Sequence, residues 1–126
     1  MILGVGVDLV EVGRLERAVA RHGEDFLREI LSGREIDRCR RTSRFLPACA
    51  AVFAAKEAVL KALGTGRAGP VSWQDIDVDL STAVPHATLS GESREAMRRL
   101  GADRVHLSLA GDRVHAAAMA VLEREP

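Results

Sequence analysis

The first thirty residues change from a strand-like to a helix-like hydrophobic pattern. Residues 2–10 form an apolar, β-branched run without helical spacing, which predicts a buried strand that ends near Asp8. From Glu11 onward the apolar residues recur at helical spacing, which predicts a helical segment that Gly23 interrupts. The apolar face of this segment consists of Val12, Leu15, Val19, Phe26, Leu27, Ile30 and Leu31.

Two further helices are predicted before the middle of the chain. Ser32 and Glu35 have the spacing of a capping box, so a short helix is expected to begin there. A long helix is predicted over 47–63, since the proline at its start is tolerated in a first turn. Gly64 ends this helix, because glycine readily adopts the left-handed conformation of a helix terminus, and a glycine-rich loop follows at 65–70.

The second half of the chain alternates between apolar and polar residues, as strands with one buried face do. The alternation is clearest over 76–80, where acidic residues separate the apolar ones. Similar patterns predict strands at 85–89, 105–109 and 115–122 and a helix at 92–100. The order β-α-α-β-β-α-β-β predicts one α+β domain over residues 1–126, with helices packed on a largely antiparallel sheet.

Composition excludes several classes of protein. The 126 residues are 47% hydrophobic and 29% charged with no net charge, which is typical of a folded domain and not of a disordered or basic tail. No apolar run approaches the roughly 18 residues of a membrane span, and no secretory leader is expected. Cys39 and Cys49 lack zinc spacing, so a reducing, cytoplasmic location fits best. Four aromatic residues leave few rings for stacking nucleic-acid bases.

Positive charge is concentrated in one part of the chain. Residues 14–44 hold nine arginines against six acidic residues, whereas 68–93 hold four acidic residues and no lysine or arginine. Arg14, Arg17, Arg21 and Arg28 would lie on one side of an unbroken helix. This arrangement is either a solvated helix face or a basic ridge that receives an acidic helix of another protein.

The N-terminal strand carries two unusual features. Gly4-Val5-Gly6 lacks the third glycine of a dinucleotide-binding fingerprint, since Leu9 stands there, so the glycines are expected to let the strand pass close to another backbone. Asp8 follows in an apolar strand, where a carboxylate needs a partner. That partner is an arginine, a helix cap or a metal ion.

The helix over 48–63 contains the only two lysines of the chain, Lys56 and Lys61, against sixteen arginines. Glu57 and Lys61 are four residues apart, so they form either an exposed ion pair or part of a functional site. The second interpretation combines a carboxylate for a hard cation, an ammonium for phosphate and the amides of the loop from Gly64 to Gly66. These groups together are what a Mg²⁺–pyrophosphate site requires.

Two segments taken together resemble the holo-acyl-carrier-protein synthases, which are small phosphopantetheinyl transferases. The first is Gly4-Val5-Gly6-Val7-Asp8-Leu9-Val10-Glu11, and the second runs from Phe53-Ala54-Ala55-Lys56-Glu57-Ala58 through Lys61 to Gly64-Thr65-Gly66. The likeness extends to Ile30-Leu31-Ser32 with Glu35 and to Trp73-Gln74-Asp75-Ile76, so it covers most of the chain.

The resemblance implies a homotrimeric α+β protein of the phosphopantetheinyl transferase fold, with active sites between subunits. It implies transfer of 4′-phosphopantetheine from coenzyme A to a serine of an acidic apo acyl carrier protein of fatty acid or polyketide synthesis, releasing adenosine 3′,5′-bisphosphate. At the matching positions the resemblance implies that Asp8 and Glu57 bind Mg²⁺, that Lys61 is catalytic and contacts coenzyme A together with Gly64, Thr65 and Gly66, and that Arg14 and Arg21 dock the carrier protein. The chemistry of such a site would have Glu57 take the serine proton, directly or through a metal-bound water.

The sequence departs from the family pattern at two places. Val52 replaces an arginine just before Phe53, and Ala110-Gly111 replaces a Ser-His pair. In the family both lost side chains lie at coenzyme A contacts. Two hypotheses therefore stay open. One is an active transferase, and the other is a catalytically impaired homologue that binds carrier protein or other subunits through the basic ridge of arginines.

Overall fold

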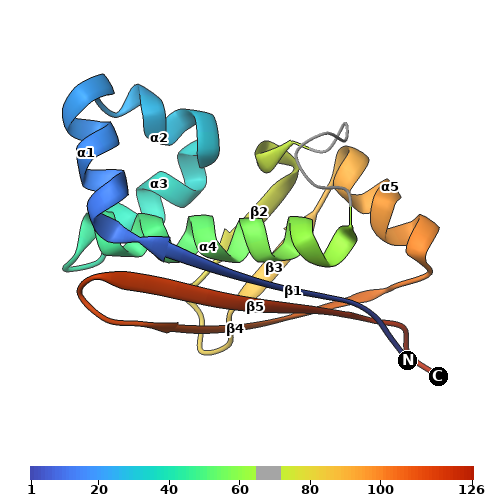
Figure 1. Cartoon of the computed structure of the whole chain (residues 1–126). Coiled ribbons are helices and arrows are strands. Elements are labelled where there is room, and N and C mark those ends of the chain that lie inside the picture. Colours follow the sequence, from blue (N-terminus) through green and yellow to red (C-terminus); the bar gives the residue numbers. More distant parts are fainter. Residues whose placement is uncertain (65–71) are drawn as a thin grey trace.

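The computed structural model of the protein describes residues 1–64 and 72–126. The described residues have an α+β architecture, in which helices cover one face of an antiparallel sheet (Figure 1). In chain order the elements are β1 (Ile2–Glu11), α1 (Val12–His22), α2 (Asp25–Ile30), α3 (Gly33–Arg40), α4 (Phe45–Leu63), the 3₁₀ helix η1 (Trp73–Asp75), β2 (Ile76–Asp79), β3 (His86–Leu89), α5 (Gly91–Leu100), β4 (Arg104–Gly111) and β5 (His115–Glu123).

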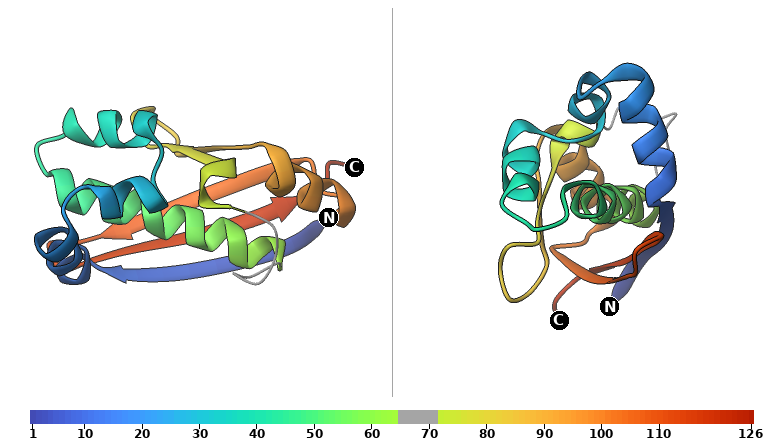
Figure 2. Two further views of the ribbon diagram at one scale, coloured as in Figure 1. Left: turned by 90° about the horizontal axis from the view of Figure 1, so that it is seen from above. Right: turned by 90° about the vertical axis from the view of Figure 1, so that its left-hand side faces the viewer.

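The strands form two sheets instead of the single one expected. The larger has the order β1-β5-β4, and the smaller pairs β2 with β3; both are antiparallel. Helix α4 lies along the larger sheet and is itself covered by α1, α2 and α3 toward its N-terminal end (Figure 2). The helix is rich in alanine and almost wholly buried, so the core is built from small side chains around it.

Strand β1 is longer than the sequence predicts. It continues to Glu11 because β5 pairs with it as far as His115, so Asp8 lies within the strand opposite Ala118 and not at its end. Gly4, Gly6, Asp8 and Val10 alternate on the face toward α4. The opposite face exposes large apolar side chains, namely Val5, Val7 and Leu9 of β1 and Met119 of β5.

Two glycines of β1 allow α4 to approach the sheet closely. A Cβ added at Gly6 would lie 2.0 Å from the carbonyl oxygen of Ala58, and one at Gly4 would lie 2.2 Å from that of Ala62. Neither position has room for any side chain, as the sequence predicts for a strand that passes close to another backbone. The short distance between strand and helix fixes how β1 and α4 present their neighbouring polar residues.

The segment after β1 is broken more often than the expected element order implies. Gly23 has a φ of 72° and separates α1 from α2, so Arg28 does not continue the row of Arg14, Arg17 and Arg21. Leu31 is extended and separates α2 from α3. No helix in the described ranges 1–64 and 72–126 is long and apolar enough to cross a membrane.

Candidate active site

Asp8 and Lys61 meet where β1 passes beneath α4. The Lys61 ammonium donates to Asp8 Oδ1 at 2.9 Å and to the Val7 carbonyl oxygen at 3.0 Å. The Asp8 side chain is 16% exposed and that of Lys61 54%, so the lysine reaches from the surface onto a mostly buried carboxylate. The partner that a carboxylate in this strand requires is therefore a lysine of the adjacent helix.

Glu57 lies one helical turn before Lys61 and is 8% exposed. An exposed ion pair between these two residues, the simpler interpretation of their spacing, is wrong, because Glu57 is buried and the Lys61 ammonium is directed to β1. The close contact at Gly6 explains how the three residues come together, since it sets α4 directly over the strand that holds Asp8.

All three side chains line one cavity of about 680 Å³. Helix α1 supplies Arg14 to the same cavity, and the other polar lining groups are Glu11 and Glu29. The remaining wall is largely apolar, and it is formed by Leu9, Val10, Leu15, Ala18, Phe26, Ile30, Phe53, Leu60 and Trp73. Phe53 and Trp73 pack edge to face with ring centroids 5.7 Å apart, so one wall is a rigid aromatic surface.

The donors present suit a hard divalent cation that takes some of its ligands from the protein and others from a substrate. Mg²⁺ in phosphate sites takes one or two protein carboxylates and fills its other positions with phosphate oxygens and water. Asp8 and Glu57 supply two such carboxylates in one cavity. In the described part of the chain no cluster of three or more histidine, cysteine, aspartate or glutamate side chains forms a complete metal site.

Arg14 and Arg21 lie along the outer face of α1, and both are exposed. Arg21 lines a second hollow of about 600 Å³, which shares Ala18, Phe26 and Glu29 with the first. The surface from Asp8 to Arg21 is therefore continuous. Arg28 lies apart from this row and pairs with Asp25 at 2.8 Å.

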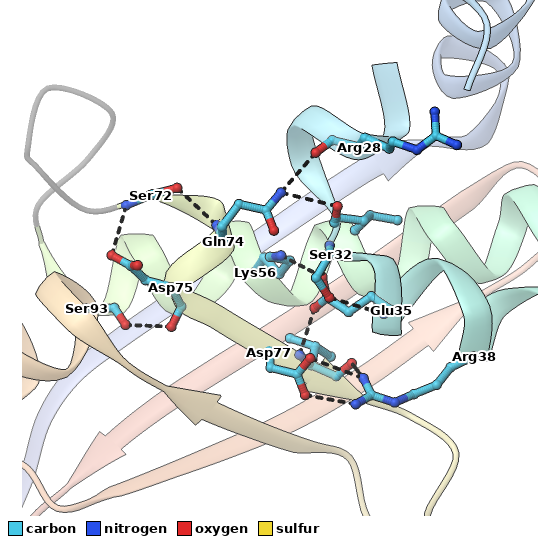
Figure 3. A network of polar contacts seen from close by, with 12 residues as sticks. Arg28, Ser32, Glu35, Arg38, Lys56, Ser72, Gln74, Asp75, Asp77 and Ser93 are labelled. Atoms are coloured by element: carbon cyan, nitrogen blue, oxygen red, sulfur yellow. Dashed lines mark hydrogen bonds and ion pairs between the residues drawn. The ribbon is translucent and has the colours of Figure 1, made fainter. Parts of the chain in front are cut away.

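Lys56 belongs to the core and not to the cavity, a role that sequence analysis did not assign. Its ammonium is fully buried and lies 2.7 Å from Glu35 Oε1. Figure 3 shows the two side chains directed toward each other. Burial lowers the pKa of Lys56, and the charge and hydrogen bond of Glu35 oppose that change. Glu35 also completes the predicted capping box with Ser32, at 2.8 Å from its amide nitrogen, and accepts a hydrogen bond from the Val78 amide at 2.8 Å.

The positions that depart from the family pattern lie in different surroundings. Val52 is buried within α4 and is part of the core, so it adds no polar group to the cavity. Ala110 and Gly111 are exposed at the end of β4, next to a turn in which Asp112 accepts hydrogen bonds from the amides of Val114 and His115. Of the expected loop residues, Gly64 ends α4 with a φ of 75°, whereas Thr65 and Gly66 lie outside the described residues.

The chain is similar to holo-acyl-carrier-protein synthases over nearly its whole length. It is 44% identical to the synthase of Alkalilimnicola ehrlichii, across 98% of both chains. The crystal structure of the Neisseria meningitidis synthase matches with a TM-score of 0.88 at 30% identity, covering 98% of this chain and 100% of that one. The Helicobacter pylori synthase in complex with coenzyme A matches with a TM-score of 0.77 at 32% identity, covering 94% and 99%.

The family assignment rests on sequence as well as on fold. The model of the 4′-phosphopantetheinyl transferase superfamily matches residues 4–118, which include most of β1, all of α4 and the beginning of β5. The α+β fold and the enzyme class that the sequence motifs predict are both confirmed. The chain belongs to the 4′-phosphopantetheinyl transferase superfamily.

Proposed function

We propose that the protein transfers 4′-phosphopantetheine from coenzyme A to a serine hydroxyl of an apo acyl carrier protein, with Mg²⁺, and releases adenosine 3′,5′-bisphosphate. The observation that supports this most directly is the convergence of Asp8, Glu57 and Lys61 in one cavity. Relatives named as holo-acyl-carrier-protein synthases and the coenzyme A complex of the Helicobacter pylori protein support the choice of both substrates.

In the proposed reaction the serine oxygen attacks the phosphorus that carries the pantetheine arm. The bond from that phosphorus to the bridging diphosphate oxygen breaks, and the serine proton passes to the Glu57 carboxylate. Asp8 and Glu57 would hold Mg²⁺, which offsets the negative charge that develops on the leaving diphosphate oxygen. The remaining acceleration comes from orienting the hydroxyl and the diphosphate within the cavity.

Lys61 is proposed to bind the diphosphate of coenzyme A. Its ammonium lies at the cavity, and its partly exposed side chain has room to turn from Asp8 toward a phosphate oxygen. The backbone amides at Gly64, Thr65 and Gly66 are proposed to contribute further contacts to phosphate.

The carrier protein is proposed to dock along α1. Arg14 lines the cavity and Arg21 the adjoining hollow, so an acidic helix placed on α1 would bring its serine to the cavity mouth. Ala18 and Phe26 line both the cavity and the adjoining hollow and offer apolar contact. The carrier protein belongs to fatty acid or polyketide synthesis in this proposal.

A homotrimer is proposed because nothing in the described residues, 1–64 and 72–126, covers the outer face of the larger sheet. Val5, Val7 and Leu9 are each more than half exposed and lie beside Met119, which makes an apolar patch across two strands. Patches of this kind mark interfaces, and two further copies of the chain are the proposed occupants.

A reducing, cytoplasmic location is proposed too, supported by the free thiols of Cys39 and Cys49.

The alternative is a catalytically impaired homologue that binds carrier protein or other subunits. The valine at position 52 favours it, because this buried apolar side chain stands where the family has an arginine that contacts coenzyme A. The exposed Ala110-Gly111 end of β4 likewise lacks the side chains of the family pattern. Charged hydrogen bonds to phosphate are worth about 1.5–3 kcal/mol each, so these losses bear on coenzyme A affinity.

Intact-mass spectrometry tests the proposal against the alternative. Apo acyl carrier proteins from fatty acid and polyketide synthesis are incubated with the protein, coenzyme A and Mg²⁺, and the expected result is the mass gain of one phosphopantetheine arm. Glu57→Ala should abolish the gain, whereas Glu92→Ala, an exposed glutamate on α5 outside the cavity, should keep it. No gain with any carrier protein at high coenzyme A concentration would favour the binding module.

A further inference from the structure

The Lys61 ammonium occupies one of the two carboxylate oxygens with which Asp8 would bind a metal ion. It lies 2.9 Å from Asp8 Oδ1, and a second hydrogen bond of 3.0 Å to the Val7 carbonyl oxygen fixes it over that strand. The Asp8 carboxylate is mostly buried, so its accessible coordination positions are few. Lys61 thus neutralises Asp8 with a cation that belongs to the chain itself.

We propose that Lys61 and the divalent cation compete for Asp8, and that the coenzyme A diphosphate removes this competition by drawing Lys61 away. This inference rests on the proposed function, in which Asp8 holds Mg²⁺ and Lys61 binds diphosphate. Its consequence is that metal and coenzyme bind cooperatively, through a side chain that changes partners.

The physical basis is repulsion between two cations at one oxygen. An ammonium 2.9 Å from Oδ1 and a metal ion bound to that atom would lie within a few ångströms of each other, where like charges repel strongly outside bulk water. The ammonium must therefore leave Asp8 before the metal binds tightly. Lys61 is 54% exposed and has a flexible stem, so it can leave without disturbing α4.

A diphosphate makes that departure favourable. An ammonium that leaves Asp8 and Val7 for water loses two hydrogen bonds, whereas one that moves to a phosphate oxygen gains a charge-assisted bond in return. Coenzyme A should therefore tighten metal binding beyond the direct contact between metal and phosphate. By linkage, the metal must tighten coenzyme A binding by the same factor.

Mn²⁺ binding measured by electron paramagnetic resonance tests the competition without any turnover. Free Mn²⁺ is quantified against native protein and Lys61→Met, each with and without coenzyme A. In the absence of coenzyme A, Lys61→Met should bind Mn²⁺ about fivefold more tightly, the factor that corresponds to a partly exposed ion pair. In Lys61→Met, the factor by which coenzyme A tightens Mn²⁺ binding should be about fivefold smaller than in the native protein.

Two control variants separate this ion pair from general electrostatics. Lys61→Arg keeps a cation beside Asp8 and should bind Mn²⁺ as the native protein does. Arg14→Met removes one positive charge from the same cavity without a contact to Asp8 in the described residues, so it should change Mn²⁺ affinity by much less than Lys61→Met. Equal effects of Lys61→Met and Arg14→Met would overturn the competition.

The outcomes distinguish this inference from the proposed function. Tight Mn²⁺ binding that Lys61→Met leaves unchanged or weakens overturns the competition and leaves the proposed metal site standing. Absence of Mn²⁺ binding in every variant, with coenzyme A present, overturns the metal site and the inference together. Stronger binding in Lys61→Met with an undiminished effect of coenzyme A refutes the proposed transfer of Lys61 to diphosphate.

Discussion

Replacing Gly6 by alanine should force β1 and α4 apart and thereby separate the residues of the candidate site. The added Cβ would lie 2.0 Å from the Ala58 carbonyl oxygen and 2.6 Å from the Ala62 nitrogen, whereas ordinary contact begins at 3.4 Å. Both obstacles are backbone atoms of a buried helix, so no flexible side chain can move aside. The helix itself must shift by more than an ångström, a distance implied by these contacts.

The cost of that shift can be bounded from the packing. Overpacking a well-packed core costs about 1–3 kcal/mol, and a backbone obstacle places Gly6→Ala at the upper end of that range. For a domain of this size, about 3 kcal/mol corresponds to a fall in Tm of roughly 10 °C. Activity should fall by more than stability explains, because misplacing reacting groups by an ångström costs about 100-fold in rate.

Circular dichroism melting and the mass-based transfer assay measure the two effects separately. Gly33→Ala is the matched control, since a Cβ at Gly33 meets nothing within 4 Å at the start of α3. This control should retain native activity and a native or slightly raised Tm. Native Tm and activity in Gly6→Ala would refute the argument that close backbone contact positions the site.

Three further changes test the supporting structure. Lys56→Ala should lower the free energy of unfolding by about 3–5 kcal/mol, because it leaves Glu35 buried without its countercharge. Urea unfolding measures this change, and the Lys56→Met/Glu35→Gln double variant should lose less free energy of unfolding than Lys56→Ala. Ser32→Ala removes a side-chain helix cap and should cost about 1 kcal/mol in the same assay. Hydrogen bonds from the His115 and Val114 amides lower the pKa of Asp112 below its ordinary 3.8. The ionised Asp112 carboxylate therefore stabilises the fold above pH 3.8, and this stabilisation is lost as the pH falls through the lowered pKa. An NMR titration of Asp112 at or above 3.8 would contradict this, and Asp112→Asn should weaken the loss of stability in acid.

Features encoded by neighbouring residues could be predicted from the sequence. The capping box of Ser32 and Glu35 forms as its spacing indicates, since both hydrogen bonds join residues three apart. The glycines of β1 likewise allow the close approach that their spacing suggested. Short-range backbone geometry determines the capping box, and the absence of a side chain on the glycines leaves room for another backbone whichever segment supplies it.

Features that depend on distant partners could not be predicted in this way. Lys56 and Lys61 lie on one helix and look alike in sequence, yet one is buried against Glu35 and the other reaches Asp8. Only the positions of α3 and β1 around α4 separate their roles. Arg28 leaves the row of arginines because Gly23 turns the chain before it, at the interruption that this glycine predicts in the helical segment.

The Glu35 carboxylate also has a consequence for the order of folding. Its partners are the Ser32 amide, the Lys56 ammonium and the Val78 amide, which lie 3, 21 and 43 residues away along the chain. A partly folded state with α3 docked on α4 but without β2 would bury a carboxylate oxygen that lacks one of its donors. Such states are penalised, so α3, α4 and β2 should assemble and come apart as one cooperative unit.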